Sequence, residues 1–123
     1  MENYSKQFPN LAYLLDCYFH EDQFQVYDWN GKEHNYEGIV RYFKVKENAG
    51  QISKTEKDLE EFLELSLQWD EEKIDEVLRS SFDGIFFAPF FGMTYREFLE
   101  GTLRILKEPL QISQNEFIPK FIG

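Results

Sequence analysis

The chain has 123 residues, a length typical of one domain that buries a single hydrophobic core without disulfides. Aromatic residues make up 18% of the sequence, the one cysteine excludes an internal disulfide, and no apolar run reaches the ~20 residues of a membrane-spanning helix. A formal net charge of −10 disfavours general binding to nucleic acid, whose phosphates attract Lys and Arg, and favours basic partners.

The first predicted helix begins within FPNL, because Pro9 is tolerated in a first helical turn and Asn10 is an alternative cap. Its apolar residues recur at three- and four-residue steps on one helical face: Phe8, Leu11, Leu14, Leu15, Tyr18 and Phe19. A polar and aromatic connection follows over residues 20–35, with a turn signal at Asn30-Gly31.

A second helix is predicted over about residues 33–47, with a narrow apolar stripe of Tyr36, Ile39, Val40 and Phe43. The segment KENAGQ breaks this pattern around Gly50. Ser53 and Glu56 then have the spacing of a capping box, which predicts that a third helix starts there and runs to about Gln68. Its expected core residues are Leu59, Phe62, Leu63 and Leu67.

A fourth helix is predicted after Asp70, with an acidic start that suits the helix dipole. Its stripe is Ile74, Val77 and Leu78. The segment FDGIFFAPFFGM is rich in Phe and broken by Gly and Pro, so we expect it to be irregular and largely buried. Thr94 and Glu97 form a second capping box before the clearest amphipathic pattern in the chain: Tyr95, Phe98, Leu99, Thr102, Leu103 and Leu106.

Taken together, these patterns predict an all-α fold, a compact single-domain bundle of about five helices spanning residues 1–123. Pro109 ends the last helix, and the tail after it is expected to be a short strand or an ordered arm. We interpret residues 1–7 and 110–123 as terminal arms. The N-terminus lacks a basic region followed by an apolar stretch, so we expect a cytoplasmic protein.

The stretch YFHEDQ, residues 18–23, combines rings, a histidine and carboxylates and therefore raises the question of catalysis or metal binding. Only two histidines are present, His20 and His34, and their spacing is not that of a zinc site. We interpret His20 as a helix end, where an imidazole can bond the last carbonyls. Cys17 has His20 three residues later, but a buried, inert thiol is the interpretation we adopt. No catalytic residue, cofactor or metal ligand is therefore predicted.

The charge is concentrated in one part of the chain. Residues 56–76 hold ten acidic residues against two lysines, a net charge of −8. The apolar stripes place six of these carboxylates outward on the third and fourth helices: Glu60, Glu61, Glu64, Glu72, Asp75 and Glu76. This surface is either a solvated face or a docking surface for a basic partner. A second candidate contact surface is the connection that bears Glu21, Asp22 and Asp28, with Tyr27 and Trp29 as aromatic anchors.

The stretches FPNLAYLLDCYFHED, residues 8–22, and FGMTYREFLE, residues 91–100, resemble the small all-helical immunity proteins of bacterial contact-dependent growth inhibition systems. The matching residues are Phe8, Pro9, Leu11, Tyr18, Phe19, His20, Asp22, Gly92, Thr94, Tyr95, Arg96, Glu97, Phe98 and Leu99. The resemblance implies a cytoplasmic protein, without catalysis, that binds and blocks the C-terminal domain of a cognate toxin, commonly a nuclease.

Two hypotheses for the function follow. The first is an immunity protein, monomeric when free, that covers a basic toxin surface with its carboxylates and binds neither nucleic acid nor membrane. The second is an acidic adaptor or regulatory domain without a toxin partner. A small hydrolase that uses Cys17 or the carboxylates is a third, weaker alternative.

Overall fold

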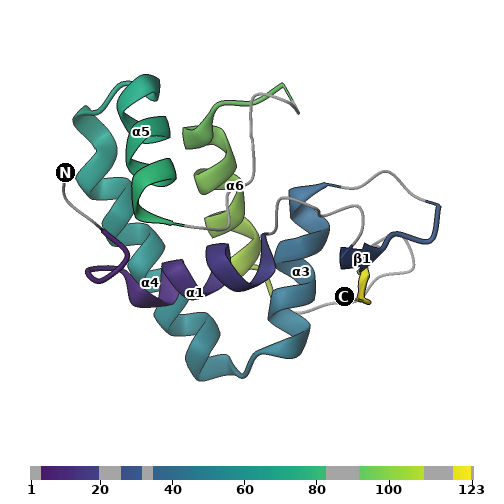
Figure 1. Cartoon of the computed structure of the whole chain (residues 1–123). Coiled ribbons are helices and arrows are strands. Elements are labelled where there is room, and N and C mark those ends of the chain that lie inside the picture. The colour runs from purple at the N-terminus through teal and green to yellow at the C-terminus, as the bar shows by residue number, and fades with distance from the viewer. Residues whose placement is uncertain (1–3, 20–25, 32–34, 83–91, 110–117, 123) are drawn as a thin grey trace.

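The computed structural model describes residues 4–19, 26–31, 35–82, 92–109 and 118–122. Within these ranges five α-helices dominate the chain (Figure 1), so the predicted all-α class is confirmed. The helices are α1 (Pro9–Tyr18), α3 (Tyr36–Lys46), α4 (Ala49–Leu65), α5 (Glu71–Ser81) and α6 (Tyr95–Lys107). A 3₁₀ turn, η1 (Ser66–Gln68), links α4 to α5, and two short strands, β1 (Tyr27–Asp28) and β2 (Lys120–Phe121), pair with each other.

The core lies where α6 packs against both α3 and α4, with α1 lying across α4 (Figure 1). Rings fill much of this core in edge-to-face contacts, which suit the charge distribution of aromatic faces and edges. Phe98 of α6 contacts both Phe19 and Tyr36, each with ring centroids 5.3 Å apart. Phe62 of α4 contacts Phe8 at 5.5 Å. These rings join four segments that lie far apart in the sequence.

Helix α1 buries every residue of its predicted stripe. Pro9 occupies its first turn as expected, but the alternative that Asn10 caps the helix is wrong. Asp58 of α4 supplies the acceptor instead: its Oδ2 accepts hydrogen bonds from the amides of Asn10, at 2.7 Å, and Leu11, at 3.2 Å. The helix dipole also stabilises a carboxylate at this position, because the N-terminal end of a helix is its positive end. Because Asp58 is buried and engaged, it does not belong to the exposed acidic surface.

The predicted start of the third helix is wrong. Helix α4 begins at Ala49, because Asn48 caps it by accepting a hydrogen bond from the Gln51 amide at 2.8 Å. Gly50 therefore lies in the first turn instead of breaking the helix, and Ser53 lies inside it. An Asn cap satisfies the same free amides as a Ser cap, and the earlier cap adds a further turn of helix.

Leu67 is the other correction in this region, since it was expected in the core and is 65% exposed. Helix α4 ends at Leu65 and the chain continues as the tighter η1 turn. A 3₁₀ turn has three residues per turn, so the α-helical register of the stripe is lost after Leu63. Leu59 and Phe62 are buried as predicted, and Leu63 is partly buried.

The starts of α5 and α6 confirm their predicted caps. Asp70 accepts a hydrogen bond from the Lys73 amide at 2.8 Å. Thr94 and Glu97 form the reciprocal capping box: Thr94 Oγ1 accepts from the Glu97 amide at 3.0 Å, and Glu97 Oε1 accepts from the Thr94 amide at 2.8 Å. Both stripes are buried, except that Leu103 is half-buried and Ile105 joins the core without having been predicted.

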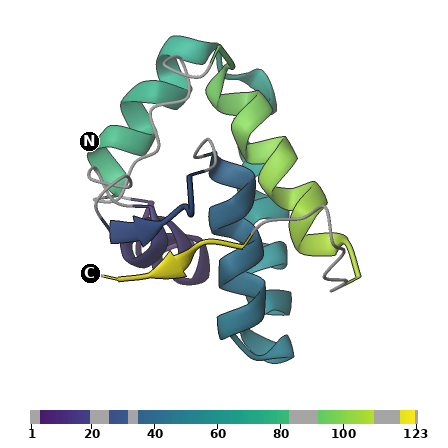
Figure 2. The same cartoon turned by 90° about the vertical axis from the view of Figure 1, so that its right-hand side faces the viewer.

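The chain's C-terminal tail contributes β2, which runs antiparallel to β1 with Tyr27 opposite Phe121 and Asp28 opposite Lys120 (Figure 2). The predicted short strand in the tail is thus present at residues 120–121. The turn signal after β1 is confirmed as well, because Asn30 and Gly31 both adopt positive φ. Residues 110–117 and most of the Phe-rich segment, residues 83–91, lie outside the described residues.

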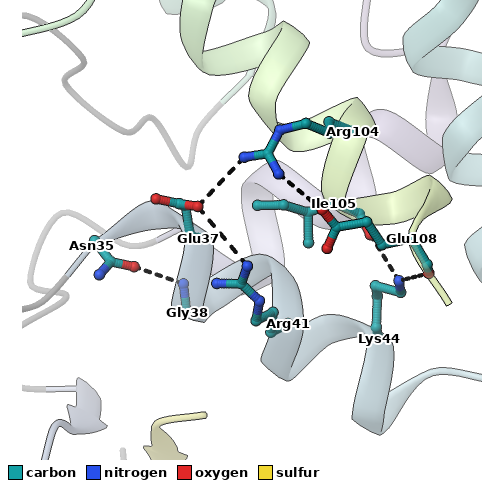
Figure 3. Close-up of polar contacts among 8 residues, drawn as sticks. All are labelled: Asn35, Glu37, Gly38, Arg41, Lys44, Arg104, Ile105 and Glu108. Atoms are coloured by element: carbon teal, nitrogen blue, oxygen red, sulfur yellow. Dashed lines mark hydrogen bonds and ion pairs between the residues drawn. The ribbon is translucent and has the colours of Figure 1, made fainter. Parts of the chain in front are cut away.

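A polar seam joins α3 to α6 (Figure 3). Lys44 is 6% exposed, and its Nζ donates hydrogen bonds to the carbonyl oxygens of Ile105, at 2.7 Å, and Glu108. The Ile105 carbonyl also accepts from the Glu108 amide at 3.2 Å, so the ammonium group adds charge-assisted hydrogen bonds at the end of α6. Glu37 lies between Arg41 and Arg104 at the outer edge of the same seam, 3.9 and 3.5 Å from their guanidinium nitrogens.

Candidate partner-binding surface

The six carboxylates predicted to face outward on α4 and α5 do lie at the surface. Glu60, Glu61, Glu64, Glu72 and Glu76 are exposed and Asp75 is half-buried. Helices α4 and α5 do not run along each other, since α5 packs against α6 while α4 packs against both α6 and α1. They meet at the η1 corner, which brings the end of α4 and the start of α5 together (Figure 1). The three carboxylates on α5 border an open depression together with Arg79 and Ser80.

Cations neutralise only part of this surface. Lys107 lies 3.1 Å from Glu60, and Arg79 lies 2.7 Å from Asp75. For the other four carboxylates no ion pair occurs within the described ranges: Glu61, Glu64, Glu72 and Glu76. Like charges that remain uncompensated repel one another, and together they attract a basic partner over a distance of about one Debye length, ~8–10 Å.

The second candidate surface, the connection after α1, is described only in part. Glu21 and Asp22 lie outside the described residues, as do His20 and His34. Asp28 is exposed on β1, and its Oδ1 accepts a hydrogen bond from the Asn30 amide at 2.9 Å. Trp29 is 8% exposed, and its ring lies beside Gly38 and contacts the Tyr27 ring, with centroids 6.0 Å apart, so it belongs to the core. Tyr27, the other expected anchor, is buried too, so Asp28 and Asn30 are the side chains that the described part of this connection exposes.

The expectation that Cys17 is buried is wrong, because its side chain is exposed on α1. Partial desolvation, and then the negative charges of Asp16 and Glu47, raise the pKa of the thiol above its usual value. A raised pKa keeps the thiol protonated near neutral pH, which is the opposite of what an activated nucleophile needs. Among the described side chains, no group of three or more His, Cys, Asp and Glu is arranged to hold a metal ion.

The TYRE segment at residues 94–97 organises the η1 corner. The Tyr95 amide donates a hydrogen bond to Glu71, which ties the starts of α5 and α6 together. The Arg96 guanidinium donates to the carbonyl oxygens of Ser66 and Trp69, the latter at 3.2 Å. The contacts of Tyr95 and Arg96 therefore give this segment a structural role at the corner.

Sequence reasoning missed two exposed apolar residues at the same corner. Leu65 is 39% exposed and Leu67 is 65% exposed. The exposure of Leu67 could have been suspected from its position, because it continues the helical stripe but lies only three residues before the Asp70 cap. A helix that still continued at Leu67 would leave little room for a turn before the next helix begins.

The exposed acidic surface on a helical fold fits a protein that works by binding another macromolecule. A family model described as CdiI immunity protein matches residues 7–106, and the chain therefore belongs to the CdiI immunity protein family. This membership confirms the resemblance found in the sequence and makes the chain a toxin-neutralising immunity protein. No curated protein and no solved structure matches the chain. None of the described helices combines the length and apolarity needed to span a bilayer.

Proposed function

We propose that this immunity protein neutralises its cognate toxin by covering a basic toxin surface with the carboxylates around the η1 corner. The observation that carries the proposal is the set of four exposed carboxylates without an ion pair among the described residues: Glu61, Glu64, Glu72 and Glu76. Placing these charges on two consecutive helices has a repulsive cost, which a complementary partner offsets on binding.

A nuclease is the kind of toxin that such a surface fits best. An enzyme that cleaves nucleic acid must bind phosphates, so its substrate site carries Lys and Arg. Carboxylates presented on a rigid helical corner can occupy the same cations and exclude the substrate. The immunity protein would act in the cytoplasm as a monomer that becomes the toxin's stoichiometric partner, and it would perform no catalysis.

The alternative function is an acidic adaptor that has no toxin partner, and a binding experiment separates the two. The toxin domain to test is the C-terminal domain of the protein encoded directly upstream, because a large secreted toxin gene in that position would support the immunity function. Co-purification of the two chains, together with rescue of cell growth when both are expressed, supports immunity. No association and no rescue would contradict it.

The surface itself is tested with two variants matched in charge. Glu61→Gln/Glu72→Gln and Val45→Lys/Ile122→Lys both raise the net charge by two, but the second pair lies on α3 and beside β2, away from the corner. Rim charges act mainly on association, so we expect the Gln pair to slow the association rate about tenfold at low salt and much less at high salt. Equal rates in both variants and in wild type, without salt dependence, would remove this surface from the interface.

A further inference from the structure

The η1 corner exposes apolar side chains in the middle of the acidic surface. Leu67 is 65% exposed and Leu65 is 39% exposed. A single exposed leucine is common on soluble proteins and by itself indicates nothing. Two further properties of this corner, its rigidity and its surroundings, distinguish it from an ordinary exposed residue.

The backbone beneath the two leucines is held by partly buried hydrogen bonds. Ser66 is fully buried, and its hydroxyl donates to the Leu63 carbonyl oxygen at 3.1 Å. The Trp69 amide donates to the Ser66 carbonyl oxygen at 3.0 Å, and Arg96 of α6 donates to the carbonyl oxygens of both residues. Because the corner is already ordered, a partner that binds it loses little conformational entropy.

The Trp69 ring adds a second support. It contacts the rings of Tyr4 and Phe62, with centroids 5.8 and 5.9 Å away, and Lys73 Nζ lies 5.4 Å from its centroid. The indole therefore fills the inside of the corner, while the leucines before it point to its exposed side. Exposed carboxylates flank them along the chain: Glu61 and Glu64 before the turn, and Asp70 and Glu72 after it.

We propose that Leu67, supported by Leu65, is the apolar centre of the toxin-binding surface and that it inserts into an apolar recess of the cognate toxin bordered by Lys and Arg. The proposal rests on the proposed function and deepens it. Binding energy in protein interfaces concentrates in a desolvated centre that a polar rim shields from water. The acidic rim selects the occupant, since a neutral or acidic partner would desolvate these carboxylates without pairing them. Arg96 is then a positioning residue, which acts through the backbone that it holds.

Leu67 has a matched control in Ile122, which is 63% exposed and directly follows β2. Strand β2 pairs with β1, which lies on the opposite side of the molecule from the corner between α4 and α5 (Figure 1). The probe is the C-terminal toxin domain encoded upstream, in a catalytically inactive form. We expect Leu67→Ala to raise the dissociation rate about tenfold and Leu67→Asp to raise it further, with little change between low and high salt. Ile122→Ala and Ile122→Asp should bind as wild type does. Thermal unfolding should be nearly unchanged in all four variants, because both side chains face solvent.

The role of Arg96 is tested by a double-mutant cycle. Arg96→Ala should raise the dissociation rate in the wild-type background but add little once Leu67 is Ala, because both changes remove the same contact. Arg96→Lys restores one donor and should recover part of the loss. Equal effects of Arg96→Ala in both backgrounds would mean that Arg96 contributes only to general stability, and this part of the inference would fail.

The remaining outcomes separate the inference from the function on which it rests. If the wild-type chain does not bind the toxin domain, the proposed function fails and the inference falls with it. If wild type binds and Leu67→Asp binds equally well, the inference alone is overturned. If wild type self-associates in analytical ultracentrifugation and Leu67→Asp abolishes that association, the corner is the contact to a second copy, which also overturns the inference.

Discussion

Gly101 shows at the scale of one residue how the α3–α6 contact restricts the sequence. A Cβ atom at this position would lie 2.0 Å from the hydroxyl oxygen of Tyr36. Where nothing obstructs the new methyl group, replacing Gly by Ala inside a helix stabilises the folded protein by about 1 kcal/mol. Here we expect Gly101→Ala to destabilise the protein by about 1–3 kcal/mol, because the tyrosine ring must move within a packed core.

Urea denaturation of Gly101→Ala, Tyr36→Phe and the double variant measures this effect. Removing the hydroxyl relieves the closest contact, so Gly101→Ala should cost clearly less in the Tyr36→Phe background. A Gly101→Ala variant that is more stable than wild type would show that the two helices do not approach this closely.

Cys17 leads to a prediction about reactivity instead of stability. The thiol is exposed, but partial desolvation and the nearby carboxylates of Asp16 and Glu47 raise its pKa above the ordinary value of 9.0. Alkylation by iodoacetamide should therefore be slow at pH 7.5 and still accelerate above pH 9, because the thiolate is the reacting species. A free cysteine-containing peptide is the control. A rate at pH 7.5 above that of the peptide would indicate an activated thiol, and toxin binding lost on alkylation would bring Cys17 into the function.

At the scale of elements, the same four-residue pattern caps one helix and lies inside another. Thr94 and Glu97 form a reciprocal capping box at the start of α6. Ser53 and Glu56 have the same spacing but lie inside α4, whose cap is Asn48. What distinguishes the two sites is whether an earlier residue already caps the helix, and the four-residue pattern does not include that information.

The two sites provide a matched pair of variants. Thr94→Ala should lower the free energy of unfolding by about 1 kcal/mol through the lost cap. Ser53→Ala should leave it unchanged or raise it slightly, because Ala is the better residue inside a helix. Urea denaturation of both variants measures the difference. A cost at Ser53 equal to that at Thr94 would place the start of α4 at Ser53.

Buried tyrosines give the whole molecule a dependence on alkaline pH. The Tyr18 hydroxyl donates to Glu47, and the Tyr27 hydroxyl donates to the Tyr18 carbonyl oxygen at 2.5 Å. Burial, together with Glu47 in the case of Tyr18, raises the pKa of both phenols above the ordinary value of 10.0. The unfolded chain therefore loses these protons at a lower pH than the folded protein does. The stabilisation that these protons provide is complete below about pH 10 and falls as the pH rises further.

Urea midpoints measured from pH 8 to pH 11 test this expectation. The wild-type midpoint should fall above pH 10. The variant Tyr18→Phe/Tyr27→Phe should start from a lower midpoint at pH 8, because two hydrogen bonds are lost, one buried and one partly buried, and should fall less steeply. Lysines titrate in the same pH range in both proteins. The decisive quantity is therefore the difference between wild type and the double variant in how steeply the urea midpoint falls with pH. Parallel slopes would exclude these two tyrosines as the cause.

The sequence by itself determined the features that depend on neighbours within a few turns. Apolar residues with a 3.6-residue period predicted α1, α3, α5 and α6, because one side of each of these helices must leave water. Caps next to their own helix, such as Asp70 and Thr94, were visible for the same reason. The family could also be recognised from two short motifs, and the acidic surface followed from the outward side of two stripes.

Only the tertiary structure decided the contacts between residues distant in sequence. Asp58 caps α1 from 47 residues away, and Lys44 closes the end of α6 from 61 residues away. No local pattern distinguishes such buried charges from the solvated ones around them. The divergence of α4 from α5 and the exposure of Leu67 likewise depend on how both helices pack against α6. Period and capping determine which side of a helix is apolar, but the position of that helix in the fold follows from packing energies that the local sequence does not contain.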